Sequence, residues 1–187
     1  MPPQAKVTRE MILDAAFEVV RTEGHEALTA RRLAAYLHCS TQPVLYQFDS
    51  VSQIREETYR RADAYHTAYL TEGLEKERDP LLALGLRYIR FGAEEKALFR
   101  FLFQSGWFSG KTLEQLIRDP GAEALVTLAA QESGTAGAAA ESLFTALFSA
   151  VHGYASLLAN NAMRWDEQGA ENMLTALYGL RKEGKNE

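Results

Sequence analysis

Hydrophobic residues recur at intervals of three and four along most of this chain, a spacing that places them on one face of an α-helix. The first such pattern runs from about Thr8 to Glu23, and Gly24 follows it as a helix stop. Its apolar positions are Ile12, Ala15, Ala16, Val19 and Val20. No stretch alternates with the period of two that indicates a strand. The pattern predicts an all-α fold of about nine helices.

Two short helix patterns lie next to each other within residues 29–48. Thr29 and Ser40 precede them, and both hydroxyl side chains can cap the first turn of a helix. The residues expected to face inward are Leu33, Ala34 and Leu37 on the first helix and Val44, Leu45 and Phe48 on the second. Only His38 and Cys39 separate the two patterns, so the helices must cross steeply, as in a helix-turn-helix.

The remaining patterns predict one long helix and five later ones. Ser50 and Gln53 form a capping-box pattern at the start of the long helix, which we expect to reach about Lys76. Asp79 and Pro80 suit the start of the next helix. The later helices are expected at about 80–94, 96–104, 111–131 with an interruption near Pro120, 138–163 and 166–181. The expected domains are an N-terminal three-helix domain at 1–50, a connecting helix at 51–78 and a C-terminal bundle at 79–187.

Charge is distributed unevenly in a chain whose net charge is −5. Residues 1–61 carry eight basic and eight acidic side chains, and residues 27–48 contain two arginines and no acid. A local acid-free face on an acidic protein suits a sequence-specific DNA-binding module better than a protein that coats nucleic acid. The single Cys39 excludes an intrachain disulfide.

Residues 8–54 resemble the N-terminal domain of the TetR family of one-component transcriptional regulators. The matching positions are Ile12, Leu13, Ala15, Ala16, Gly24, Leu28, Thr29, Leu33, Ala34, Ser40, Phe48, Ser50 and Ile54. The chain departs from the family pattern twice, because Leu45 stands where Tyr is usual and Val51 where Lys is usual. Both usual residues commonly contact the DNA backbone. The resemblance implies a helix-turn-helix DNA-binding domain whose partner is a double-stranded DNA operator.

The residues of this module expected to contact DNA are Thr29, Arg31, Ser40, Thr41, Gln42, Tyr46 and Gln47. A guanidinium such as that of Arg31 can contact a guanine edge or a phosphate, and the amide of Gln42 suits adenine. By resemblance, the position of Arg31 makes a base contact in some family members. Thr29 has two open interpretations, a phosphate contact at the helix N-terminus or capping alone.

The segments 88–103 and 151–160 resemble the ligand-binding half of one branch of the family, in which a His-Gly pair in the penultimate helix matches His152 and Gly153. The ligand-binding candidates are Phe91, Phe99, Phe103, Trp107, Phe108, His152 and Tyr154. Aromatic residues at helical spacing can line a pocket for a small apolar or flat effector, or can simply form the core, and both interpretations stay open.

Small residues along the penultimate helix allow a second helix to approach it closely. The dimer-interface candidates are Ser149, Gly153, Ser156, Leu157, Met173 and Leu177. Two such helices from each of two copies would form a four-helix interface. A paired helix-turn-helix also requires a homodimer, with half-sites about 34–36 Å apart.

The sequence contains no pattern typical of a catalytic, metal or cofactor site. Glu94 and Glu95 are adjacent, so on a helix they diverge by about 100° and do not form a paired acid–base site. The N-terminus lacks a signal-peptide core, and no apolar run is expected to approach the roughly 20 residues of a membrane span. We expect a cytoplasmic, non-enzymatic protein with no cofactor, no metal and no membrane contact.

Two functional hypotheses follow. The first is a ligand-responsive transcriptional repressor that binds a palindromic operator as a homodimer and is released by a small apolar or aromatic effector. The second is an all-α dimeric small-molecule-binding protein that has lost specific DNA binding. The departures from the family pattern at Leu45 and Val51 suggest this second hypothesis. Steep salt dependence of DNA binding would distinguish the first from the second.

Overall fold

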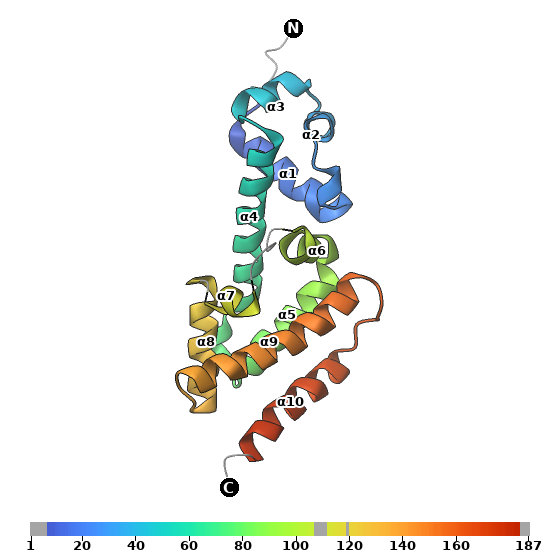
Figure 1. Cartoon of the computed structure of the whole chain (residues 1–187). Helices are drawn as coiled ribbons and strands as arrows, with labels where there is room; N and C mark the ends of the chain where they lie inside the picture. The colour runs from blue at the N-terminus through green and yellow to red at the C-terminus, as the bar shows by residue number, and fades with distance from the viewer. Residues whose placement is uncertain (1–6, 107–111, 119, 184–187) are drawn as a thin grey trace. The chain divides into compact units, whose positions relative to one another are not determined.

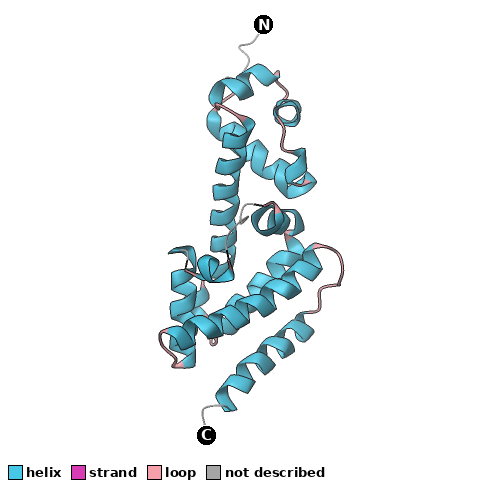
Figure 2. Ribbon diagram, viewed as in Figure 1, coloured by secondary structure: helices cyan, strands magenta, loops and turns pink. Residues whose placement is uncertain are grey.

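The computed structural model describes residues 7–106, 112–118 and 120–183, and within them every regular element is a helix (Figure 2). This confirms the all-α prediction. The ten α-helices of the described residues, labelled in Figure 1, are α1 (Arg9–Glu23), α2 (Ala30–Tyr36), α3 (Thr41–Gln47), α4 (Val51–Thr71), α5 (Pro80–Glu94), α6 (Lys96–Gln104), α7 (Leu113–Ile117), α8 (Pro120–Ser133), α9 (Ala138–Ala159) and α10 (Glu167–Glu183). Two short 3-10 helices, η1 (His25–Ala27) and η2 (Leu74–Lys76), accompany them.

Backbone chemistry explains where the helices differ from the sequence expectation. The pattern at 111–131 is two helices, α7 and α8, because Pro120 lacks an N–H and fits the first position of a helix but not its interior. Helix α4 ends at Thr71 rather than near Lys76. Gly73 follows with a φ of +67°, and a left-handed residue ends a helix.

The chain forms two compact units. The first unit comprises residues 1–68 and 95–107, and the second comprises residues 69–94 and 108–187. Helix α6 therefore belongs with α1, α2 and α3, and α4 contributes residues to both units. The three domains expected from the sequence, 1–50, 51–78 and 79–187, remain a prediction.

The first unit is built on the apolar face of α1. All five residues predicted for this face are buried, namely Ile12, Ala15, Ala16, Val19 and Val20. Helix α2 buries Leu33 and Ala34, and Val44 and Phe48 are buried in and after α3. The prediction that Leu45 also faces inward is wrong, since this side chain is 49% exposed. Successive helix residues lie about 100° apart, so a seven-residue helix that buries Val44 turns Leu45 away.

Helix α6 is attached to the first unit at both ends of its sequence. Glu95, the buried residue before α6, accepts hydrogen bonds from Arg21 Nε at 2.9 Å and from the Tyr65 hydroxyl at 3.1 Å. Farther along, the ring of Phe101 stacks on His25 with 5.9 Å between the ring centroids. These contacts to α1, η1 and α4 explain why α6 is part of the core of the first unit.

The second unit is organised around a close crossing of α5 and α9. Gly92 of α5 faces Ala155 of α9, and a Cβ added at Gly92 would lie 2.8 Å from both Cβ and O of Ala155. The residues that these two helices bury are Leu81, Leu84, Tyr88, Ile89, Phe91 and Gly92 on α5 and Ala140, Phe144, Leu147, Val151, Ala155, Leu158 and Ala159 on α9. Glycine at position 92 therefore sets how closely the two helices approach.

Replacing Gly92 with Ala is expected to lower the free energy of unfolding by about 1–3 kcal/mol, because the new methyl would meet backbone atoms that cannot move independently. The matched control is Gly85→Ala on the same helix, whose Cβ would meet side-chain methyl groups and no backbone atom, those of Leu174 at 3.1 and 3.3 Å and that of Val151 at 3.6 Å. Urea unfolding followed by circular dichroism measures both. Equal losses in the two variants would contradict this account.

Candidate nucleic-acid interface and effector region

Helices α2 and α3 are joined by a short turn at residues 37–40 and cross steeply, since Figure 1 shows α2 end-on and α3 from the side. Thr29 Oγ1 accepts a hydrogen bond from Arg32 N at 3.1 Å, so the predicted cap of α2 is confirmed. Ser40 occupies the equivalent position before α3, but its hydroxyl makes no capping hydrogen bond. Its exposed side chain therefore remains available at the start of α3.

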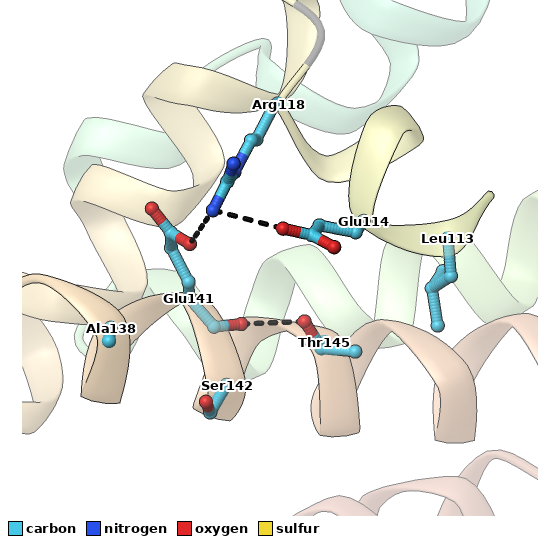
Figure 3. A pocket seen from close by; sticks show the side chains of 7 residues that line it. All are labelled: Leu113, Glu114, Arg118, Ala138, Glu141, Ser142 and Thr145. Atoms are coloured by element: carbon cyan, nitrogen blue, oxygen red, sulfur yellow. Dashed lines mark hydrogen bonds and ion pairs between the residues drawn. The ribbon is translucent and has the colours of Figure 1, made fainter. Parts of the chain in front are cut away.

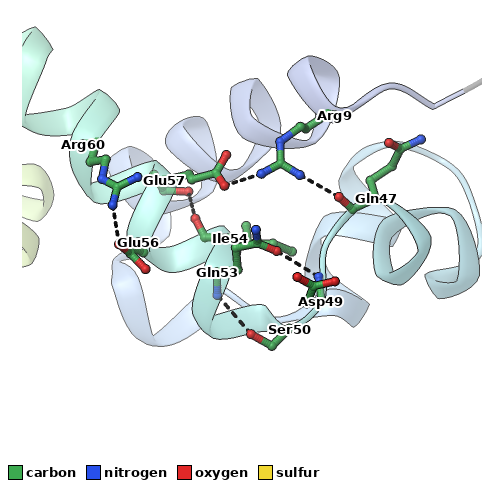
Figure 4. A network of polar contacts seen from close by, with 10 residues as sticks. Arg9, Gln47, Asp49, Ser50, Gln53, Ile54, Glu56, Glu57 and Arg60 are labelled. Atoms are coloured by element: carbon green, nitrogen blue, oxygen red, sulfur yellow. Dashed lines mark hydrogen bonds and ion pairs between the residues drawn. The ribbon is translucent and has the colours of Figure 1, made fainter.

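Arg9 attaches the C-terminal end of α3 to α4 (Figure 4). Its Nη1 donates to the backbone oxygen of Gln47 at 2.7 Å, and its Nη2 forms an ion pair with Glu57. The guanidinium carbon lies 4.1 Å from the centroid of the Phe48 ring, within the range of a cation–π contact. Together these contacts hold the orientation of α3.

Helix α4 begins with the capping arrangement that the sequence predicts (Figure 4). The backbone N of Gln53 donates to Ser50 Oγ at 3.2 Å, and Gln53 Oε1 accepts from Asp49 N at 2.9 Å. The glutamine thus satisfies an amide one residue earlier than in the usual capping box. The link from α3 to α4 is fixed by these local bonds.

The exposed side chains of α3 are polar and aromatic apart from Leu45, and none of them is acidic. Thr41 and Gln42 are exposed, and Tyr46 is 85% exposed. Gln47 differs from them, because it is half buried and its Nε2 donates to Val7 O at 3.3 Å. Thr41, Gln42 and Tyr46 therefore point outward to solvent, whereas the side chain of Gln47 is bonded to another residue of the first unit.

Two adjacent arginines on α2 have different surroundings. Arg32 Nε donates to both carboxylate oxygens of Glu23, at 2.8 and 3.0 Å. This hydrogen-bonded pair lowers the pKa of Glu23 and raises the pKa of Arg32. Arg31 is exposed and forms no ion pair with any other residue in the described part of the chain. Both arginines are charged, but of the two only Arg31 has no carboxylate partner among the described residues.

The aromatic ligand-binding candidates are distributed over both units. The second unit contains Phe91, His152 and Tyr154, the first contains Phe99 and Phe103, and Trp107 and Phe108 lie outside the described residues. The side chains of Phe91 and Phe99 are fully buried. Both therefore serve as core residues of their own units.

His152 and Tyr88 form the polar centre of an aromatic group in the second unit. His152 Nδ1 lies 2.8 Å from the Tyr88 hydroxyl, and the ring of Phe148 packs 5.3 Å from the imidazole, centroid to centroid. Burial lowers the pKa of His152, so the imidazole is neutral near pH 7. A neutral, hydrogen-bonded imidazole suits a core histidine and also suits the polar anchor of an apolar pocket.

A cleft of about 250 Å³ lies between α7 and α9 in the second unit (Figure 3). It is lined by Leu113, Glu114, Arg118, Ala138, Glu141, Ser142 and Thr145. Arg118 lies 3.1 Å from Glu114 and 3.3 Å from Glu141, so its charge is compensated. None of these residues gives a signal in the sequence, because charges spaced by four residues are typical of a solvated helix face.

Helix α9 has more apolar surface than its own chain covers. Ser149, Gly153 and Leu157 are exposed, and only 28% of the most apolar 18-residue stretch of α9 is buried. Helix α9 has 22 residues and contains an 18-residue stretch with a mean hydropathy of 1.3, so by length and composition it could cross a membrane. The expectation that no run approaches such a span is therefore wrong on length and composition. A core helix of a soluble protein meets the same criteria.

The other dimer-interface candidates are partly exposed as well. Ser156 on α9 and Met173 and Leu177 on α10 have intermediate exposure.

In the described residues, no three His, Cys, Asp or Glu side chains are grouped as metal ligands. The adjacent Glu94 and Glu95 have different partners, since Glu94 accepts from the Tyr69 hydroxyl at 2.7 Å.

Comparison with known protein families identifies the class. Residues 81–178, just over half of the chain, match the family described as tetracyclin repressor-like, C-terminal domain. The chain therefore belongs to the TetR family of regulators, whose members generally bind DNA and a small-molecule ligand, form dimers and are not enzymes. A search of curated proteins found no match.

Acid is expected to destabilise the first unit through His66. This buried side chain packs against the ring of Phe103, and burial lowers its pKa from about 6.5 to about 4. Between these two values the unfolded chain binds more protons than the folded chain. The contribution of neutral His66 to the free energy of unfolding is therefore fully present above about pH 6.5. It is lost as the pH falls towards 4, which lowers the free energy of unfolding by about 3 kcal/mol.

The variant His66→Gln lacks this titration, so its free energy of unfolding should fall less between pH 7 and pH 4.5 than that of the unmodified protein. Urea unfolding at the two pH values measures the difference. An identical pH dependence in both proteins would show that His66 is not the group responsible.

Proposed function

We propose that this protein is a ligand-responsive transcriptional regulator that represses by binding a palindromic operator as a homodimer through α2 and α3. The observation that carries the proposal is the exposed, acid-free outer face of these two helices. Arg31 lies on that face without an ionic partner among the described residues. Such a face suits the negative potential and polar base edges of a DNA major groove.

Each exposed candidate has a distinct role in this proposal. Gln42 donates to and accepts from an adenine edge, and Arg31 contacts a guanine edge or a phosphate. The hydroxyls of Ser40 and Tyr46 reach phosphates, and Thr29 places the N-terminal amides of α2 near the backbone. Gln47, which is bonded to Val7, supports the position of α3 instead of contacting a base.

We propose that a second copy of the chain packs against the exposed side of α9. The candidate residues Ser149, Gly153 and Leu157 leave an exposed stripe of small and apolar side chains on this helix, and Met173 and Leu177 of α10 are only half covered. A continuous exposed apolar surface is typical of an interaction site. A two-fold pairing would also provide the two copies of α3 that a palindromic operator requires.

The proposed effector is a small apolar or aromatic molecule bound in the C-terminal half, which includes His152. Helix α4 contributes residues to both units, so it offers a covalent route from the effector to the DNA-binding helices. An effector that binds better to the state with unsuitably spaced α3 helices would release DNA through its differential affinity.

The double variant Arg31→Ala with Gln42→Ala should weaken operator binding by at least tenfold, because each bidentate base contact is worth about 1–3 kcal/mol. Fluorescence anisotropy with labelled DNA from upstream of the coding region, at two salt concentrations, measures this loss. Arg60→Ala is the matched control, since this exposed arginine on α4 already pairs with Glu56. Unchanged affinity in the double variant would refute the assignment of the interface.

The same titration tests the alternative function, a dimeric small-molecule-binding protein without specific DNA binding. Leu45 and Val51 favour that alternative, because neither side chain can donate to a phosphate. Weak, equal binding of the unmodified protein to operator and random duplexes would support it. Tight binding that falls steeply with salt and survives competitor DNA would exclude it.

The dimer is tested by Gly153→Glu. A Cβ at Gly153 meets nothing within 4 Å in its own chain, so the variant should fold while a buried carboxylate disrupts the interface. Light scattering after gel filtration should show a monomer with an unchanged helical circular dichroism spectrum. Ala64→Glu, at an exposed position of α4, should remain dimeric. A dimeric Gly153→Glu variant would exclude this stripe as the interface.

A further inference from the structure

Large exposed hydrophobic side chains are concentrated on α2 and α3. Tyr36, Leu45 and Tyr46 are 42%, 49% and 85% exposed. The other large exposed hydrophobic residues of the described chain are Met11, Leu113, Leu157 and Met163, which are spread over α1, α7, α9 and the segment after α9. Exposed hydrophobic side chains on two helices that also carry polar groups for DNA suit an occupant that is itself partly apolar.

Leu45 has no polar atom in its side chain and therefore contributes neither a phosphate contact nor a hydrogen bond to a base. It lies three residues after Gln42 and four after Thr41, so the three side chains share one face of α3. The only apolar group that base edges present in the major groove is the C5 methyl of thymine. We propose that Leu45 is a specificity-determining residue that contacts the C5 methyl of a thymine in each half-site.

The spacing of Leu45 and Gln42 further defines the half-site. Three residues advance an α-helix by about 4.5 Å. Successive bases are about 3.4 Å apart along one DNA strand. The two side chains therefore reach the same base pair or neighbouring ones. Gln42 suits adenine and Leu45 suits thymine, so we expect one A·T pair or two consecutive A·T pairs at this point of each half-site.

Charge supports DNA rather than a protein as the occupant of this face. Residues 27–48 contain two arginines and no acid in a chain of net charge −5. Arg32 is already paired with Glu23, which leaves Arg31 of α2 as the arginine of this range without a carboxylate partner among the described residues. This inference depends on the proposed function, because it names the base that the proposed DNA-binding face selects.

The test begins with selection of tight-binding duplexes from a random pool with the full-length protein. Each thymine of the selected duplex is then replaced by deoxyuridine, which removes only the C5 methyl. At one thymine of each half-site the affinity should fall about fourfold, the value of one buried methyl group, and about tenfold or more when both half-sites are replaced. Leu45→Ala should bind thymine and deoxyuridine duplexes equally.

The controls separate this inference from the proposed function. Leu113→Ala removes a similarly exposed leucine from α7 and should keep the full deoxyuridine penalty. A specific duplex whose affinity no deoxyuridine changes, or a Leu45→Ala variant that keeps the penalty, would overturn the role of Leu45 alone. Failure to select any duplex would overturn the proposed function and this inference with it. Because Leu45 is half exposed, its truncation should leave the circular dichroism spectrum unchanged.

Discussion

The two helices proposed to bind DNA depend on burial against α1. Helices α2 and α3 have seven residues each, too few for a helix to persist alone in water. Their stability must therefore come from tertiary packing, which Leu33, Val44 and Phe48 provide within the first unit. Arg9 adds a directional attachment by bonding to the end of α3, to α4 and to the Phe48 ring. Any change that separates α1 from these helices should remove both fold and DNA binding together.

The second unit is constrained differently, because α9 has more apolar surface than the rest of the unit buries. One side of this helix packs so closely on α5 that glycine is needed at position 92. The other side presents small and apolar residues, including Gly153 and Leu157, to solvent. A helix with this composition gains stability when a second apolar surface covers it. Dimerisation would satisfy the surplus and supply paired DNA-binding helices at the same time.

The placement of α6 changes how the two halves of the sequence relate to function. The segment follows the start of the expected ligand-binding domain, yet it belongs to the same compact unit as α1, α2 and α3. The Glu95 carboxylate, bonded to Arg21 and Tyr65, explains this placement. The aromatic candidates are divided as a result, with Phe99 and Phe103 in one unit and His152 in the other. A sequence-based list of aromatic residues could not show this division.

Local chemistry alone determined the helical class, the buried face of α1 and the caps at Thr29 and Ser50, because these features depend on side-chain periodicity and on bonds between residues three or four positions apart. Tertiary structure alone decided that Leu45 faces outward and that Arg32 forms an ion pair with Glu23. It also decided that Gln47 turns towards Val7. The physical reason is that a side chain's partners and exposure depend on which distant elements the fold brings beside it, and hydrophobic spacing within one short helix contains no information about those neighbours.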